Sequence, residues 1–484
     1  MSFRKGAKPP RSALVLGGGF AGLSAAVHLA LGGAQVTLLE KAPELGGKAG
    51  VYARDGYRFD TGPSVLTLPR VLSSVFEAAG ESLPVALTPL APLCRYHFAS
   101  GRVWEVHQNV ARTTAQLSRD EAKAYTGLLD LSRRLFEAAA PTFVYGPSPG
   151  PAALLRYGLR YGLRAYPGLG LERLLARYRV SPELEPFFLR FATYLGADPF
   201  RAPAVTHNVM WAEVGLGAYY PHGGIGRLVQ ELGTLAARLG VEVVTGAEAL
   251  SLEVRDGRVI GALTASGTFG ADAVVAALDL VHTHKLLGLR SPLEAREPSL
   301  SGFVLLLGLE GRSRDLRHHN IFFPRDYESE FSAMRACRPA DDPTLYLSVS
   351  ANSDPDQAPE GHENLFVMVN APALPEGGFD WEHEASFYAE LLIERLERRG
   401  LKVTPRIRLR HWLTPADFAK TGWRGSLYGH APHGLRLALK PGQKLRGLDN
   451  LVLAGGTVHP GGGIPLAILS GKRAAEALLG RRGQ

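Results

Sequence analysis

The chain has 484 residues, of which 45% are hydrophobic and 21% are charged; this excludes a disordered chain and suggests two or three domains. Its two cysteines, Cys94 and Cys337, stand far apart and outside any CxxC motif, so we expect neither a disulfide framework nor a metal site. The net charge of +8 favours an anionic partner, and since no nucleic-acid-binding module is visible, we expect a lipid surface rather than nucleic acid.

The N-terminal part of the chain predicts a strand, a helix and a second strand around a glycine-rich turn. Ala13–Leu16 is a short apolar strand, and the second strand, Gln35–Leu39, follows a helical pattern of small and apolar residues. Between them, Gly17, Gly19 and Gly22 form a GxGxxG turn. Together these features are typical of a dinucleotide-binding unit.

Each part of this unit has a physical task. The first glycine allows the tight turn, the second lets the backbone approach a pyrophosphate, and the third lets the helix lie close to the strand. Phe20 and Ala21 begin the helix, whose N–H groups would face the phosphate charge. Glu40, which ends the second strand, would accept hydrogen bonds from ribose hydroxyls. A carboxylate disfavours a 2′-phosphate, so we expect FAD or NAD rather than NADP.

A second glycine pair lies in the loop that follows. Gly46 and Gly47 permit close backbone approach and Lys48 would sit beside a phosphate, although an ordinary loop is the alternative. Lys41, which opens this loop, is a further candidate for cofactor contact. Tyr57–Pro63 then alternates and breaks, which predicts a strand that runs into a fixed turn.

These motifs resemble the N-terminal block of the FAD-dependent phytoene desaturase and amine oxidase superfamily. The motifs that carry the resemblance are the GxGxxG turn, Glu40, LeuGlyGly at Leu45–Gly47 and PheAspThrGlyPro at Phe59–Pro63. The resemblance implies an α/β fold with a Rossmann-type domain that binds the adenosine and pyrophosphate of FAD. It also implies that Gly62 and Pro63 lie near the flavin ring.

Residues 70–200 read mainly as helix and loop, with a basic amphipathic segment at Ala152–Tyr166. In this segment arginines, leucines and tyrosines recur at helical spacing: Arg156, Arg160 and Arg164; Leu155, Leu159 and Leu163; Tyr157 and Tyr161. Such a pattern is typical of an interfacial helix, and a solvated basic face is the alternative. No run approaches the roughly 18–20 apolar residues that a membrane span requires, so we expect no span. On the interfacial interpretation of this segment, we expect a cytoplasmic protein bound peripherally to the inner face of the cell membrane.

Ordered α/β pattern returns near Tyr219. A glycine turn at Tyr219–Gly226 precedes a helix, a strand at Val241–Val244, a hairpin about Asp256–Gly257 and a strand at Asp272–Ala277. The resemblance implies a strand around Ala249 whose backbone pairs the adenine. His222 in the turn is either catalytic or structural, and a turn histidine is more often structural.

Residues 286–440 interrupt the α/β pattern of the FAD-binding part for a second time. Strands are predicted at Phe303–Leu309, Leu345–Ser350 and Leu365–Asn370, and a helix at Glu382–Arg399. ThrProAlaAsp ends on Asp417. We interpret Asp417 primarily as part of a helix N-terminal cap and only secondarily as a residue that takes part in the chemistry. GlySerLeuTyrGly, residues 425–429, resembles the family's loop before the final flavin segment.

The C-terminal segment Leu451–Gly471 predicts a strand, a glycine cluster and an apolar helix. Gly461–Gly463 would expose N–H groups to negative charge on a reduced flavin ring. The segment resembles the bacterial carotenoid desaturase signature, and the absence of an acid at Gly456 favours this branch over amine oxidases. HisProGlyGly, with SerGly after the helix, looks somewhat more like the hydroxycarotenoid 3,4-desaturases and diapocarotenoid enzymes than like phytoene desaturases proper. The candidate cofactor residues here are Gly455, Gly456, Gly463, Ile464 and Pro465.

The resemblance implies FAD-dependent dehydrogenation of a carotenoid such as phytoene, lycopene or a hydroxycarotenoid. The expected division is an FAD domain built from residues 10–70, 206–285 and 441–482, a helical membrane-facing region at 71–205 and an α+β substrate domain at 286–440. A carotenoid isomerase or oxygenase, an amine or protoporphyrinogen oxidase, and a non-enzymatic carrier of prenylated proteins are the alternatives. The electron acceptor, oxygen or a quinone, and the proton acceptor are left open.

Overall fold

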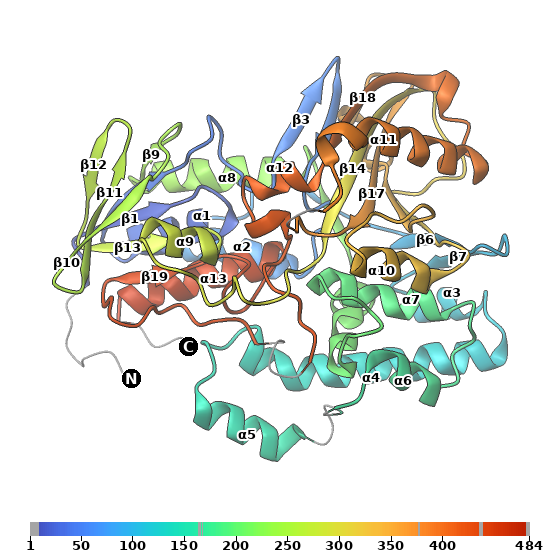
Figure 1. Cartoon of the computed structure of the whole chain (residues 1–484), viewed down its shortest axis with the longest axis horizontal. Coiled ribbons are helices and arrows are strands. Elements are labelled where there is room, and N and C mark those ends of the chain that lie inside the picture. The colour runs from blue at the N-terminus through green and yellow to red at the C-terminus, as the bar shows by residue number, and fades with distance from the viewer. Residues whose placement is uncertain (1–8, 163–165, 167, 376–377, 435–438, 481–484) are drawn as a thin grey trace.

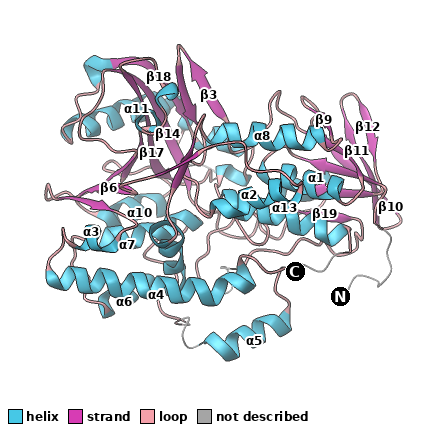
Figure 2. Cartoon of the chain, turned by 180° about the vertical axis from the view of Figure 1, so that it is seen from behind, coloured by secondary structure: helices cyan, strands magenta, loops and turns pink. Residues whose placement is uncertain are grey.

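The computed structural model describes residues 9–162, 166, 168–375, 378–434 and 439–480. A five-stranded sheet lies at one end of the molecule and a seven-stranded sheet at the other (Figure 1). A group of helices packs below the seven-stranded sheet in this view, and one of them, α5 (Pro151–Tyr161), hangs outside the main body (Figures 1 and 2). The chain passes between these parts several times.

The five-stranded sheet is entirely parallel, and it unites three remote parts of the sequence. Its strands, in spatial order, are β19 (Leu451–Leu453), β13 (Ala273–Ala276), β1 (Ser12–Leu16), β2 (Gln35–Leu39) and β9 (Glu242–Val244). The central strands are buried on both faces, which is why they read as continuous apolar runs.

Helices cover one face of this sheet and a small sheet covers the other. The helices are α1 (Phe20–Leu31), α2 (Pro69–Ala78), α8 (Ile225–Arg238) and α13 (Ile464–Leu478). On the other face lie β10 (Ser251–Arg255), β11 (Arg258–Thr264), β12 (Gly267–Gly270) and α9 (Leu280–Leu286). Contact between α1 and α13 is so close that a Cβ on Gly471 would lie 2.0 Å from the Ala21 carbonyl oxygen. Glycine is therefore required there.

The seven-stranded sheet is mixed. Its strands, in spatial order, are β18 (Ile407–Leu413), β14 (Ser301–Glu310), β17 (His362–Ala371), β16 (Leu345–Ser348), β15 (His319–Phe322), β6 (Cys94–His97) and β7 (Val103–Val106). One face packs on α11 (Trp381–Arg398), and the opposite face turns Val304 and Phe366 toward the interior of the molecule.

Smaller elements connect the two sheets. Two small antiparallel pairs are the hairpin of β3 (Val51–Arg54) with β4 (Tyr57–Asp60), and β5 (Leu87–Pro89) with the distant β8 (Tyr219–Pro221). The short helices around the larger sheet are α10 (Tyr327–Arg335), α12 (Pro415–Ala419), η5 (Ser350–Asn352), η6 (Pro355–Gln357), η7 (Thr404–Arg406) and η8 (Trp423–Gly425).

The helical group is built around α4 (Arg119–Phe143). A capping box of Ser118 and Glu121 starts this helix, and an aromatic cluster packs its buried face. The other members are α3 (Val110–Thr114), α5, α6 (Leu171–Arg177), α7 (Glu185–Leu189), η2 (Arg190–Leu195), η3 (Ala204–Asn208) and the π-helix η4 (Trp211–Gly215). None of the helices in the described ranges is long and apolar enough to cross a membrane.

The structure corrects one sequence-based expectation about secondary structure: Ala249 lies in the irregular segment between β9 and β10 and not in a strand. Residues 70–200 are mainly helix and loop, as expected. Within them, β6 and β7 add to the seven-stranded sheet through parallel pairing of β6 with the distant β15. Leu163 and Arg164 of the predicted basic helix lie outside the described residues.

Candidate active site

A large cavity of about 1190 Å³ lies between the two sheets and the helical group. Ligand pockets in proteins typically measure roughly 300–1,000 Å³. The cavity is therefore larger than a typical small-molecule pocket. Its wall is mixed: glycine turns and charged groups line one part, and apolar side chains from α4 and α5 line another.

The GxGxxG turn shapes the first part of the wall. Gly17 has φ +100°, a conformation that side chains disfavour, and a Cβ there would lie 2.8 Å from the Ala277 carbonyl oxygen. A Cβ on Gly22 would lie only 1.8 Å from the Gly17 carbonyl oxygen, so this glycine sets the contact between helix and strand. By contrast, a Cβ on Gly19 would meet no protein atom closer than 3.5 Å. Gly19 borders the cavity.

Helix α1 begins at this turn with its first N–H groups uncapped by any side chain. Gly19 is the N-cap residue and, having no side chain, leaves these donors open. Four backbone donors at a helix start need partners, and they attract negative charge. The start of α13 is built in the same way, with Gly463 at φ +99° as its N-cap and no side-chain cap.

Glu40 lies beside the first helix start and is only 6% exposed. Its Oε2 accepts a hydrogen bond from the Gly18 N–H at 2.7 Å, and its Oε1 accepts one from the Ala42 N–H at 2.9 Å. These bonds hold the carboxylate at the cavity wall while leaving further lone pairs for a ligand, because an ionised carboxylate has about four acceptor positions.

Two lysines add positive charge to the cavity wall. Lys48 Nζ donates to the Leu427 carbonyl oxygen at 2.7 Å, and burial lowers the pKa of Lys48, against the opposing influence of Asp279. Lys440 Nζ donates to the Tyr428 carbonyl oxygen at 2.6 Å. Burial, reinforced by the charge of Lys48, lowers the pKa of Lys440 to about 8. Both side chains line the cavity.

Almost all residues predicted to contact a cofactor line this one cavity. They are Gly17, Gly19, Phe20, Ala21, Glu40, Lys41, Gly46, Gly47, Lys48, Gly62, Pro63, Ala249, Gly455, Gly456, Gly463, Ile464 and Pro465. Gly22 is not part of the wall and acts through helix packing. The structure thus brings together groups that are more than 400 positions apart in the chain.

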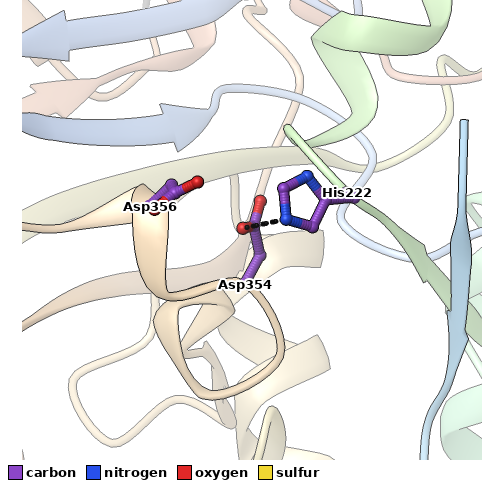
Figure 3. Close-up of side chains that lie close together, drawn as sticks. All are labelled: His222, Asp354 and Asp356. Atoms are coloured by element: carbon purple, nitrogen blue, oxygen red, sulfur yellow. Dashed lines mark ion pairs between the residues drawn. The ribbon is translucent and has the colours of Figure 1, made fainter.

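His222 and Asp417 are not part of the cavity wall. Asp417 forms a capping box with Thr414 at the start of α12, as its sequence context predicts. His222 lies on the turn after β8, and its Nε2 is 3.4 Å from Asp354 Oδ1 (Figure 3). With Asp356 these side chains form a group that could hold a metal ion. However, Asp354 already binds the Gly223 N–H, so its position is explained by support of the turn.

The apolar part of the wall comes from the helical group and the larger sheet. Phe136, Ala139 and Phe143 project from α4, and Leu154 and Tyr157 project from α5. The rings of Tyr157 and Phe143 meet edge to face at 4.7 Å between centroids. The inner side of α5 therefore closes the cavity, which the sequence pattern did not predict.

Polar side chains interrupt this apolar wall, and the sequence analysis missed them. Arg190 and Tyr194 line the cavity from η2, and Tyr346 lines it from β16. Tyr346 Oη lies 2.5 Å from Ser64 Oγ and 2.8 Å from His319 Nδ1. The sequence did contain a sign that Arg190 is buried, because it is a charged residue within the apolar run PheLeuArgPhe. Tyr346 becomes visible only when β15 and β16 are paired.

Comparison with known proteins identifies the family. The model of the family named flavin containing amine oxidoreductase matches residues 20–479. A 1-hydroxycarotenoid 3,4-desaturase of Flavobacterium sp. is 30% identical over 97% of this chain and 99% of its own length. A 4,4'-diapolycopene oxygenase of Methylomonas sp. is 31% identical over 96% of this chain and 97% of its own. The chain belongs to the bacterial carotenoid desaturase branch of this family.

The resemblance inferred from the motifs is thereby confirmed, and this carotenoid desaturase family member is an FAD-dependent oxidoreductase. A solved oxidoreductase from Methanosarcina mazei shares the fold, with a TM-score of 0.67 at 16% identity over 96% of this chain and 100% of the other. The residues of the cavity fit FAD: it offers a close backbone approach at Gly19, two uncapped helix starts and a buried carboxylate at Glu40.

Proposed function

We propose that this protein is a carotenoid desaturase that introduces C=C bonds into a long polyene. The observation that carries the proposal is the continuity of the cavity. The glycine turns and helix starts suited to FAD share one cavity with a wall of aromatic and aliphatic side chains from α4, α5 and β14. A flavin ring and a polyene can therefore meet there without water between them.

In this reaction bound FAD would accept the hydride that leaves one carbon while the neighbouring carbon loses a proton. The protein contributes binding, orientation and exclusion of water. We propose that the starts of α1 and α13 hold the negatively charged parts of the cofactor and that Glu40 holds its ribose. Gly62 and Pro63 would form the turn beside the ring, and Val304 and Phe366 the apolar wall that aligns the polyene.

We further propose that α5 docks on the lipid surface from which the substrate comes. No residue of α5 is buried, and Leu155 and Leu159 expose 65% and 81% of their surface. Arg156 and Arg160 are also exposed on this helix. The opposite side of α5 carries Leu154 and Tyr157, which line the cavity. A helix with one side toward lipid and the other toward the cavity would suit a substrate that dissolves only in bilayers.

The test is turnover of polyenes held in liposomes. The FAD-loaded protein is incubated with vesicles that contain phytoene, lycopene or 1-hydroxylycopene, and products are read by absorption and mass. A product that has lost two hydrogens per step by mass and absorbs at longer wavelength supports the proposal. Gain of oxygen at an end methyl group would identify an oxygenase, and an isomer of unchanged mass an isomerase. A flavin-bearing protein that alters none of the polyenes contradicts the proposal.

A further inference from the structure

A group of side chains suited to metal binding lies where the turn before α8 meets the larger sheet. His222 lies on this turn, between β8 and α8, whereas Asp354 and Asp356 lie at η6, between β16 and β17. The three side chains come together in space (Figure 3). None of these three residues lines the cavity described above. The group is therefore separate from the space assigned to FAD and the polyene.

The buried member of the group, Asp354, has one carboxylate oxygen without a hydrogen-bond partner. Asp354 is 0% exposed. Its Oδ2 accepts hydrogen bonds from the Gly223 N–H and from Gln357 Nε2, both at 2.7 Å, and this oxygen accounts for the support of the turn. Among the described residues, Oδ1 accepts no hydrogen bond. An unsatisfied buried carboxylate oxygen is costly, so a cation bound to it would stabilise the folded state.

The His222 ring faces this oxygen at a spacing that suits two ligands of one ion. His222 Nε2 lies 3.4 Å from Asp354 Oδ1, close enough for an ion pair, but the contact is not a hydrogen bond. Two ligand atoms that each lie about 2.1 Å from one tetrahedral ion are roughly 3.4 Å apart. An ion would therefore fit between these groups with little change in their separation.

Asp356 supplies the third ligand. One potential ligand atom from each of the three residues lies within 4.8 Å of the other two. His222 and Asp356 are exposed, so small movements of their side chains would bring all three ligand atoms to one ion. The solvent-facing side of such an ion would be left for water.

An ion would reach the buried oxygen from the exposed side of the group. Asp354 Oδ1 itself has almost no accessible surface. The neighbouring His222 side chain, however, is 59% exposed. Rotation of this ring away from Asp354 would open a path to Oδ1, and the ring would then return to bind the ion from the other side.

We propose that His222, Asp354 and Asp356 bind one divalent transition-metal ion of the Zn²⁺ type. One imidazole nitrogen and two carboxylates form a mixed ligand set that suits Zn²⁺, whereas Ca²⁺ and Mg²⁺ prefer oxygen alone. The ion has a structural role, because it lies outside the cavity wall and joins the turn before α8 to η6 of the larger sheet. This inference does not depend on the desaturase function.

The test is Zn²⁺ binding by the full-length, FAD-loaded protein after treatment with EDTA and removal of the chelator. Calorimetric titration with ZnCl₂ should show about one site per chain, and bound Zn²⁺ should raise the unfolding temperature. Ca²⁺ and Mg²⁺ should bind at least about ten-fold more weakly. His222→Ala and Asp356→Asn each remove one exposed ligand. Each variant should weaken Zn²⁺ binding by at least about ten-fold and keep the wild-type flavin content.

His383→Ala is the matched control. His383 is also exposed and its Nδ1 lies 2.7 Å from Asp380 Oδ2, but in the described part of the chain this pair belongs to no three-residue group of potential metal ligands. The control should bind Zn²⁺ like the wild-type protein. Equal affinity of the wild-type protein, His222→Ala and Asp356→Asn would overturn the proposal, because the ion would then bind elsewhere. Absence of Zn²⁺ binding by the wild-type protein would also overturn it and leave only an ion pair between His222 and Asp354.

X-ray absorption at the zinc edge identifies the ligands directly. The Zn²⁺-loaded wild-type protein should show oxygen ligands and a single imidazole, and His222→Ala should lose the imidazole signal. Sulfur ligands, or several imidazoles, would overturn the assignment of the ion to this group.

Discussion

At the scale of single residues, an added methyl group should have different effects at two glycines of the first turn: it should lower fold stability at Gly22 and prevent flavin binding at Gly19. In Gly22→Ala the Cβ meets the Gly17 carbonyl oxygen at 1.8 Å, so the fold itself is expected to be destabilised. In Gly19→Ala and Gly19→Val the side chain enters the cavity where a pyrophosphate must approach. These variants should fold normally and purify without flavin.

The measurements are the ratio of absorbance at flavin and protein bands and the melting temperature of the cofactor-free protein. Gly158→Ala, on the exposed α5 with open space around the new Cβ, is the control and should keep both properties. Native flavin content in Gly19→Val would contradict the assignment of this turn.

The buried Lys440 side chain leads us to expect that the stability of the protein depends on pH. Its pKa is lowered by burial to about 8, from 10.5 in an unfolded chain. Between these pH values the unfolded state binds more protons than the folded state, so the free energy of unfolding rises with pH. Below about pH 8 Lys440 is charged in both states, and the destabilising effect of burying its charge is then largest. Lys440→Met removes the buried charge. The advantage of the variant in free energy of unfolding should therefore be largest at pH 7 and shrink toward pH 9.5.

Denaturant titrations of the cofactor-free proteins at several pH values test this expectation. Other titrating groups are shared by the two proteins and cancel in the difference. A difference in stability that stays constant from pH 7 to pH 9.5 would show that Lys440 is not titrating in this range.

At the scale of elements, α5 should control lipid binding. Each arginine near an anionic membrane contributes about 1 kcal/mol, so Arg156→Glu/Arg160→Glu should weaken binding to anionic liposomes by at least about 30-fold. Flavin content should be unchanged, and turnover of bilayer-held substrate should fall with binding. Added salt should weaken docking of the wild-type protein in the same direction, because exposed charges are screened.

The control for α5 is Arg290→Glu/Arg296→Glu, which makes the same charge change at two exposed arginines elsewhere. It should bind liposomes nearly as well as the parent protein. If the α5 variant floats with liposomes like the control, this helix is a solvated basic face and docking occurs through another surface.

The elements that the sequence predicted are those with local signals. The turn at Gly17, the hairpin about Asp256–Gly257 and the cap at Thr414 each depend on neighbouring residues, and all are present in the structure. Strand β6, CysArgTyrHis, alternates between apolar and polar residues and pairs with the nearby β7. Its place in the larger sheet depends on β15, more than 200 positions away, which no local pattern indicates. Likewise, Arg190 and Tyr346 lie far apart in the sequence and meet only at the cavity wall.

At the scale of the whole molecule, the cavity is lined by segments from the N-terminus, the middle and the C-terminus. A ligand that binds all of them should stabilise the folded state, by about 2.7 kcal/mol at one hundred times its dissociation constant. Added FAD should therefore raise the unfolding temperature of the cofactor-free protein. FMN at the same concentration lacks the adenosine that would reach Glu40 and should raise it much less.

Gly19→Ala is the matched variant for this measurement, since it should unfold at the temperature of the cofactor-free wild-type protein whether or not FAD is present. An equal shift with FMN would mean that the adenosine part of the cavity contributes little.

The shared cavity also dictates an order of assembly. Because the glycine turns and the apolar wall border the same space, a cofactor bound at the turns would form part of the wall of the space proposed for the polyene. On this proposal we expect FAD to bind first and a bound polyene to slow its release. Bound FAD would then be a lasting part of the cavity wall, and the polyene would be the ligand that is exchanged in each round of the reaction.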